Sequence, residues 1–206
     1  MKKITLLLFI VFSFSYSQNL TVESGGTLTI EKTGAVTVSG NFSNSGTVTM
    51  NSDADEFSSI KISGTTSGNV TYNRFVNYAA SGEWDLIGSP VDGLSISDFI
   101  NTNTSGTATL ATNGSAYAVG YYDNSTDTWT NYTTGTAGGA GNFDIGKGYQ
   151  MGTVSGGTQI LAFTGTISSS DETQSIINND AANSGSGRRW NLVANPYPTY
   201  INANDD

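Results

Sequence analysis

A short apolar–threonine–apolar unit occurs four times near the N-terminus and constrains the fold of the chain more than any other feature. The first three copies recur every eight residues and the fourth follows after 12: Leu20–Val22, Leu28–Ile30, Val36–Val38 and Val48–Met50. Alternation along a strand sends both apolar residues to one face and the threonine to the other. Short strands at a fixed period, joined by glycine-rich turns, favour a β-solenoid with stacked coils. An antiparallel meander needs the same turn residues and is the alternative.

The rest of the chain also has the composition of an all-β protein. Threonine, valine and tyrosine are frequent, 25 glycines interrupt them, and only 12% of the residues are charged; this combination is typical of many short strands. The repeats stop and aromatic residues become denser near Tyr78. We therefore predict a β-solenoid-like segment over residues 18–76 and a β-sandwich, jelly-roll-like domain over residues 77–206. Residues 95–100 are interpreted as a short helix or turn, capped by Ser97.

Residues 1–17 have the three parts of a secretory signal peptide. Lys2 and Lys3 are basic, Ile4–Phe14 form an apolar stretch of 11 residues, and small residues precede Gln18. This stretch is too short to span a bilayer. We predict a secreted or outer-surface protein that does not span the membrane after cleavage; an uncleaved membrane anchor is the alternative.

The charge and the missing residue types limit the classes of function. Removal of Lys2 and Lys3 leaves six basic and 17 acidic side chains, a net charge of −11, which repels nucleic acid. The chain has no cysteine and no histidine, so a disulfide framework, histidine-dependent catalytic triads and the commonest zinc ligand are excluded. A glycoside hydrolase needs only two carboxylates; candidates exist, but no pattern pairs them (Glu83, Asp85, Asp144). We predict a non-enzymatic protein.

A predicted hairpin carries the candidate ligand-binding residues. Residues 116–122 and 128–132 form its arms, and their aromatic side chains are candidates for stacking on a glycan: Tyr121, Tyr122, Trp129 and Tyr132. The turn between the arms holds Asp123 and Asp127, which resemble the start of a calcium loop, although the residues that follow depart from that pattern. A solvated turn is the alternative, here and at the acidic residues 53–56. No other cofactor is predicted.

Two distant segments share one motif of tryptophan, leucine, a β-branched residue and proline. The first runs from Trp84 to Pro90 and the second from Trp190 to Pro196. Tryptophan, leucine and β-branched residues favour a pleated surface, and proline ends a ladder. We expect both indoles to be largely buried core residues. Gly146 and Gly148 are expected to supply special backbone angles or tight packing.

These motifs, in their order along the chain, resemble those of large secreted surface proteins of the Bacteroidetes type, which are commonly exported by type IX secretion. The motifs are Asn73–Val76, Trp84–Val91, Gly146–Tyr149, Phe163–Thr166 and Trp190–Pro198. The resemblance implies an exported all-β protein of adhesin or scaffold character. Such proteins usually continue into a β-sandwich sorting domain, so we expect this sequence, which ends at Asp206, to be a fragment of a longer protein.

Together these observations predict a non-catalytic secreted or cell-surface protein with a structural or adhesive role. The alternative is a carbohydrate-binding module that accompanies a polysaccharide-degrading enzyme. The expected partners are extracellular polysaccharide or other surface proteins.

Overall fold

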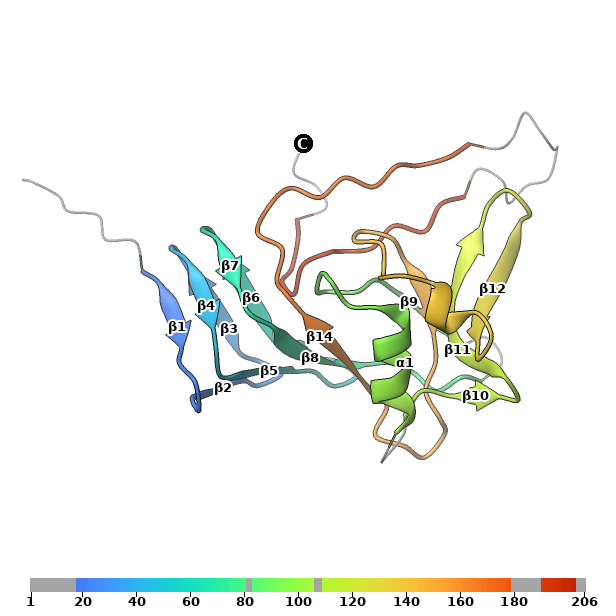
Figure 1. Ribbon diagram of the computed structural model, residues 1–206, viewed down its shortest axis with the longest axis horizontal. Helices are drawn as coiled ribbons and strands as arrows, with labels where there is room; N and C mark the ends of the chain where they lie inside the picture. Colours follow the sequence, from blue (N-terminus) through green and yellow to red (C-terminus); the bar gives the residue numbers. More distant parts are fainter. Residues whose placement is uncertain (1–17, 81–82, 106–108, 179–189, 203–206) are drawn as a thin grey trace, which may run out of the picture.

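The computed structural model describes residues 18–80, 83–105, 109–178 and 190–202, and over these ranges the protein is built mainly of β-strands (Figure 1). The predicted signal peptide, residues 1–17, lies outside the described residues. No helix among the described residues has the length and apolar character needed to cross a membrane.

The N-terminal strands pair in parallel and form three ladders. The strands are β1 (Leu20–Val22), β2 (Thr27–Ile30), β3 (Ala35–Val38), β4 (Phe42–Asn44), β5 (Thr47–Asn51), β6 (Ser59–Ile62), β7 (Thr66–Ser67) and β8 (Val70–Phe75). Leu20 lies beside Phe42, Thr27 beside Thr47 and Ala35 beside Ser59, so the chain returns to each ladder after 22, 20 and 24 residues. Parallel pairing differs from that of an antiparallel meander.

The predicted alternation within the repeats is confirmed. Val22, Ile30, Val38, Val48 and Met50 are buried, whereas Thr21, Thr29 and Thr37 are exposed. The stacking differs from a simple succession, because neighbouring repeats belong to different ladders and the second repeat stacks on the fourth. Successive eight-residue units therefore contribute strands to different ladders.

The part of the chain that follows β8, called the second half below, contains an antiparallel sheet in the order β10–β11–β13–β9, with β12 paired to β11. Its strands are β9 (Asp85–Ile87), β10 (Thr112–Asn113), β11 (Ala116–Asp123), β12 (Thr128–Thr133) and β13 (Tyr149–Met151), and a 3-10 turn, η1 (Ala137–Gly139), follows β12. The predicted hairpin is confirmed as β11 and β12. Figure 1 shows this sheet at one end of the molecule and β1 at the other.

Strand β14 (Ile160–Gly165) joins the two halves. It pairs antiparallel with β8, which also pairs parallel with β5, so one sheet has the order β14–β8–β5–β2. Phe163 lies opposite Tyr72 in this sheet, and both side chains are buried. The core is therefore shared between the parallel ladders and the second half.

Helix α1 (Ile96–Thr104) covers this shared core with an aromatic contact (Figure 1). The ring of Phe99 lies 4.8 Å from Phe163 and 5.1 Å from Phe143. The predicted helix is present, but the predicted cap is wrong: Ser95, and not Ser97, accepts a hydrogen bond from the backbone N–H of Asp98 at 3.0 Å. The hydroxyl of Ser97 instead pairs with that of Ser95.

Tyr149 makes the stability of the fold sensitive to alkaline pH. Its side chain is buried, and burial raises its pKa from 10.0 to about 12. Between these values the unfolded chain has lost a proton that the folded chain still holds, so stability falls as pH rises. We expect the free energy of unfolding to fall by about 1.4 kcal/mol per pH unit from this group. Urea titrations at pH 9 to 12 measure the free energy of unfolding at each pH. This free energy should fall less steeply with pH for Tyr149→Phe than for wild type, and an equally steep fall in both proteins would contradict the assignment.

Candidate functional site

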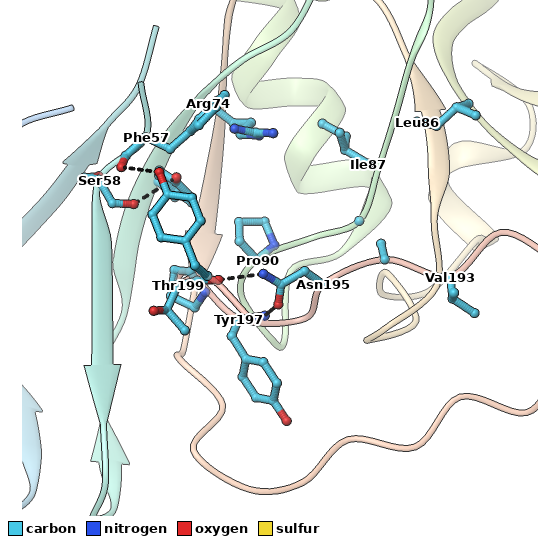
Figure 2. A pocket seen from close by; sticks show the side chains of 15 residues that line it. Phe57, Ser58, Arg74, Leu86, Ile87, Pro90, Val193, Asn195, Tyr197 and Thr199 are labelled. Carbon is cyan, nitrogen blue, oxygen red and sulfur yellow. Dashed lines mark hydrogen bonds between the residues drawn. The ribbon is translucent and has the colours of Figure 1, made fainter. Parts of the chain in front are cut away.

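The larger of two candidate sites is a pocket between the parallel ladders and the second half, with a volume of about 460 Å³. Figure 2 shows Arg74 of β8, Pro90 after β9 and Asn195 of the C-terminal segment lining it. Three distant parts of the chain therefore build this pocket. Its volume lies within the range of roughly 300–1,000 Å³ that is usual for small-molecule sites.

The two tryptophan–proline motifs meet at this pocket, which residues 86–90 and 193–200 both help to line. A Cβ atom added to Gly88 would lie 2.6 Å from Cβ of Ala194. The backbone N–H of Ala194 donates to the carbonyl of Gly146 at 2.9 Å, and that of Gly148 donates to Leu192 at 2.9 Å. The second motif is therefore held by a single β-bridge, Lys147 to Val193, instead of the expected strand.

Gly146 and Gly148 each have a geometric reason to be glycine. Gly146 has a φ of +76°, in the region that side chains rarely adopt. A Cβ on Gly148 would overlap with the side chain of Leu192. Gly148 thus permits the close approach of the C-terminal segment, whereas Gly146 supplies the backbone angle of the turn.

A turn over the Asn-Pro-Tyr-Pro sequence fixes the wall of the pocket (Figure 2). The side chain of Asn195 accepts from the N–H of Tyr197 at 3.0 Å and donates to the carbonyl of Thr199 at 2.6 Å. The N–H of Ile60 in β6 donates to the carbonyl of Pro198 at 2.9 Å. The C-terminal segment is thereby tied to the parallel ladders.

Arg74 is the charged residue among the described residues of this pocket, and it is not one of the site residues predicted from the sequence. Its guanidinium carbon lies 3.8 Å from the centre of the Phe57 ring, a cation–π contact. Burial lowers the pKa of Arg74 because the charged form loses hydration. Only its position in the sequence indicates that Arg74 points inward. Val70, Tyr72 and Arg74 lie on the same face of β8, and the first two are buried.

The second site is a cluster of three aromatic rings at the hairpin end of the molecule. The ring centre of Tyr122 lies 5.4 Å from that of Trp129 and 4.7 Å from that of Trp190, and the two indoles are 5.8 Å apart. The expectation that Trp190 is a buried core residue is wrong: it is 41% exposed, and Trp129 is 38% exposed. Trp190 itself belongs to no strand, and its segment forms only the bridge from Val193 to Lys147, just before β13.

Tyr121 and Tyr132 do not belong to this cluster. They contact each other, with ring centres 5.7 Å apart, and pack against the core. Adjacent residues of a strand point to opposite faces, so the ring of Tyr121 lies apart from the three-ring cluster, although Tyr121 lines the cavity that adjoins it. Of the four predicted stacking residues, the cluster therefore contains only Tyr122 and Trp129, and it adds Trp190.

A cavity of about 220 Å³ adjoins the aromatic cluster. Tyr122 and Trp190 line it together with polar side chains: Asp123, Asn124, Lys147, Gln174, Ser175 and Asn191. Two hydrogen bonds to the backbone of Ile177 orient the side chain of Asn191. Its Oδ1 accepts from the N–H of Ile177 at 2.9 Å, and its Nδ2 donates to the carbonyl of Ile177 at 2.8 Å. This end of the molecule thus combines exposed aromatic rings with amide, carboxylate and ammonium groups.

The predicted calcium residues are engaged within the hairpin turn. Asp123 accepts hydrogen bonds from the N–H and hydroxyl of Ser125, at 2.9 and 2.6 Å, and these bonds lower its pKa. Asp127 accepts from the hydroxyl of Tyr122 at 2.7 Å. Over the described ranges no three acidic side chains gather in a group able to hold a metal ion. In the other acidic turn, Lys32 forms ion pairs with Asp53 and Glu56.

The remaining residues that were selected from the sequence pack against, or bond to, other parts of the chain. Trp84 is half-buried against the core and Pro90 is buried, whereas Pro196 is half-buried. The side chain of Asp85 accepts two hydrogen bonds from Asn77, each of 2.9 Å, and Asp144 pairs with Lys147 at 3.2 Å.

The fold and these two sites define an all-β protein with a ligand-sized pocket and an exposed aromatic cluster. Residues 9–205 match a family model, and the chain belongs to that family, which is described as a domain of unknown function, DUF8693. No curated protein and no solved structure matches the chain.

Proposed function

We propose that the protein is an exported, non-catalytic module that binds an extracellular saccharide through Tyr122, Trp129 and Trp190. The observation that carries this proposal is the clustering of the three rings beside a polar cavity, with both indoles exposed. Exposed aromatic groups rimmed by polar residues mark interaction sites. This proposal places the ligand at the hairpin end of the molecule.

A saccharide matches the chemistry of this surface. Sugar rings present C–H groups on their faces, which the electron-rich faces of indole and phenol rings attract. Their hydroxyl groups need both donors and acceptors, and amide groups, which can act as both, line the cavity at Asn124, Gln174 and Asn191. Each of these amides also donates a hydrogen bond within the chain. The cavity of about 220 Å³ is small, which favours one end or one branch of a glycan over a bulky folded partner.

We further propose a surface location with an adhesive or structural role. The predicted signal peptide and the resemblance to type IX secretion proteins support export. The alternative is that this module delivers a polysaccharide-degrading enzyme to its substrate. Other surface proteins remain a second class of partner under the adhesive role.

The architecture that we propose is a short β-solenoid followed by a β-sandwich-like domain. Three parallel ladders with a return of 20 to 24 residues support the solenoid. Val119 and Met151 of one sheet and Leu161 and Phe163 of the other lie in one core, which supports the sandwich. The solenoid would then act as a spacer that presents the hairpin end.

A glycan array with variants of the aromatic cluster tests the proposed function. We expect the wild-type protein to retain a set of polysaccharides, and Trp129→Ala and Trp190→Ala each to weaken that binding at least about tenfold. A loss of about 1.4 kcal/mol corresponds to that factor, and central aromatic residues typically contribute this much or more.

Tyr78→Ala is the matched control, because Tyr78 is 39% exposed but lies outside the cluster. It should bind as the wild type does. The proposal would be refuted if the wild type retained no glycan, or if both tryptophan variants bound glycans as tightly as the wild type does.

A further inference from the structure

The larger pocket contains a positive charge that no carboxylate of the described chain neutralises. The ion pairs among the described residues involve Lys32 and Lys147, and Arg74 forms none. Among the described residues that line the pocket there is no aspartate or glutamate, and Arg74 is the one that carries a charge. Asp85, which also acts on the pKa of Arg74, already accepts two hydrogen bonds from Asn77. An unpaired cation in a partly dehydrated wall is costly unless an anion joins it.

A neighbouring hydroxyl is also unsatisfied. Ser58 borders the pocket and is 2% exposed, and its Oγ has no hydrogen-bond partner among the described residues. The adjacent Tyr72 donates to the carbonyl of Ser58 at 3.1 Å and not to this hydroxyl. Such groups are uncommon in native proteins. The wall around Arg74 therefore holds a hydroxyl without a hydrogen-bond partner, and a guanidinium that bonds the side chain of Tyr72 but forms no ion pair with a described carboxylate.

The other walls select a compact ligand with an apolar face. Phe57 and Pro90 present flat hydrocarbon surfaces, and Thr199 and Asn195 add polar groups near the C-terminal segment (Figure 2). Guanidinium binds carboxylate through two parallel hydrogen bonds, which fixes the orientation of the bound group. A ring that carries one carboxylate and several hydroxyls fits all of these walls.

We propose that this pocket binds a uronic acid unit of a saccharide, with the carboxylate on Arg74. The carboxylate follows from the pocket alone, and the saccharide part rests on the proposed function. Val193 lines both this pocket and the cavity beside the aromatic cluster, so one acidic chain can contact both sites. An acidic peptide would supply the same carboxylate without the ring hydroxyls, and is distinguished by the test.

The net negative charge of the protein does not oppose this assignment at short range. Charges further away than about 8 Å are largely screened at physiological salt. The carboxylate would contact Arg74 directly, within a wall to which the described residues contribute no acidic side chain. The attraction between the carboxylate and the guanidinium would offset the cost of dehydrating both groups.

Matched sugar pairs test the proposal by isothermal titration calorimetry. D-Galacturonate, D-glucuronate and D-mannuronate are each compared with the neutral hexose of the same configuration. We expect at least one acid to bind about tenfold or more tightly than its neutral partner. Arg74→Gln should abolish this preference, and Arg74→Lys should retain only part of it, because ammonium keeps the charge but loses the paired geometry.

Lys61→Gln is the matched charge control, since Lys61 is exposed on β6 and lies outside the pocket; it should keep the full preference. Trp129→Ala should also keep it, which separates this site from the aromatic cluster. Thermal unfolding of Arg74→Gln checks that the variant is folded, and a rise in the melting temperature of the wild type with the acid gives a second measure of binding. The proposal would be overturned if the wild type preferred none of the acids, or if folded Arg74→Gln kept the full preference. It would also be overturned if N-acetyl-aspartate amide bound to the wild type and no uronate did.

Discussion

Phe163→Ala is expected to lower the free energy of unfolding by about 4 kcal/mol, within the usual range for removal of a buried phenylalanine. Phe163 is fully buried in β14 and lies opposite Tyr72 of β8. The centre of its ring lies 4.8 Å from the ring centre of Phe99 and 6.2 Å from that of Phe143. The cavity left by alanine would therefore open between the sheet, helix α1 and the loop that precedes β13. Urea unfolding followed by circular dichroism measures the change.

The same experiment examines whether the two halves unfold together. All three tryptophans follow β8 in the chain and lie outside the parallel ladders, so their fluorescence reports the part after β8, whereas circular dichroism reports both parts. Because β14 joins the sheet of the parallel ladders, we expect both signals to shift by the same amount in Phe163→Ala. Ile176→Ala is the control: Ile176 is 73% exposed, and its removal should change stability by less than about 0.5 kcal/mol. A shift of the fluorescence signal alone would contradict the shared core.

The local pattern of the repeats was predictable because it depends only on alternation along each strand. Val22, Ile30 and Val38 are buried as the pattern predicts. The stacking order was not predictable from the period, since an eight-residue spacing fits both a coil with one strand and a circuit with three. The inserted residues 40–43 include Phe42 and Ser43, the start of β4, which pairs in parallel with β1.

The candidate sites required contacts between distant segments. Alternation alone separates Tyr121 from Tyr122, and that part of the aromatic cluster could have been predicted. The position of Trp190 could not, because it depends on how the C-terminal segment crosses the sheet near Lys147. Arg74 had a signal, since it follows two inward residues of β8, but its significance depends on the distant Pro90 and Asn195.

The C-terminal segment connects the two proposed binding sites physically. Trp190 at its start belongs to the aromatic cluster, and Tyr200 near its end lines the larger pocket. Bonds to Gly146, Gly148 and Ile60 hold the segment between them. A ligand that contacts both sites would therefore lie along this one hydrogen-bonded segment. It would bind more tightly than a ligand that contacts only one of the two sites.

Gly68→Ala is expected to destabilise the parallel ladders by about 4 kcal/mol, because backbone strain and overpacking act at the same position. Gly68 follows β7 and has a φ of +80°. A Cβ at this position would overlap with the backbone carbonyl of Asn44, which belongs to the next strand of the ladder. A carbonyl held in a sheet cannot move as a side chain can, so β4 and β7 would have to separate.

Gly93→Ala is a matched control that isolates the overlap from the strain. Gly93 has a φ of +78°, nearly equal to that of Gly68, but a Cβ there would have no neighbour within 4 Å. Its substitution should cost only about 1 kcal/mol, the usual penalty for alanine in this region. The difference of about 3 kcal/mol between the two variants, measured by urea unfolding, is then the energy of the close approach between β4 and β7. Equal destabilisation by both variants would show that the ladders tolerate separation at this point, and that the stacking of β7 contributes little to the stability of the fold.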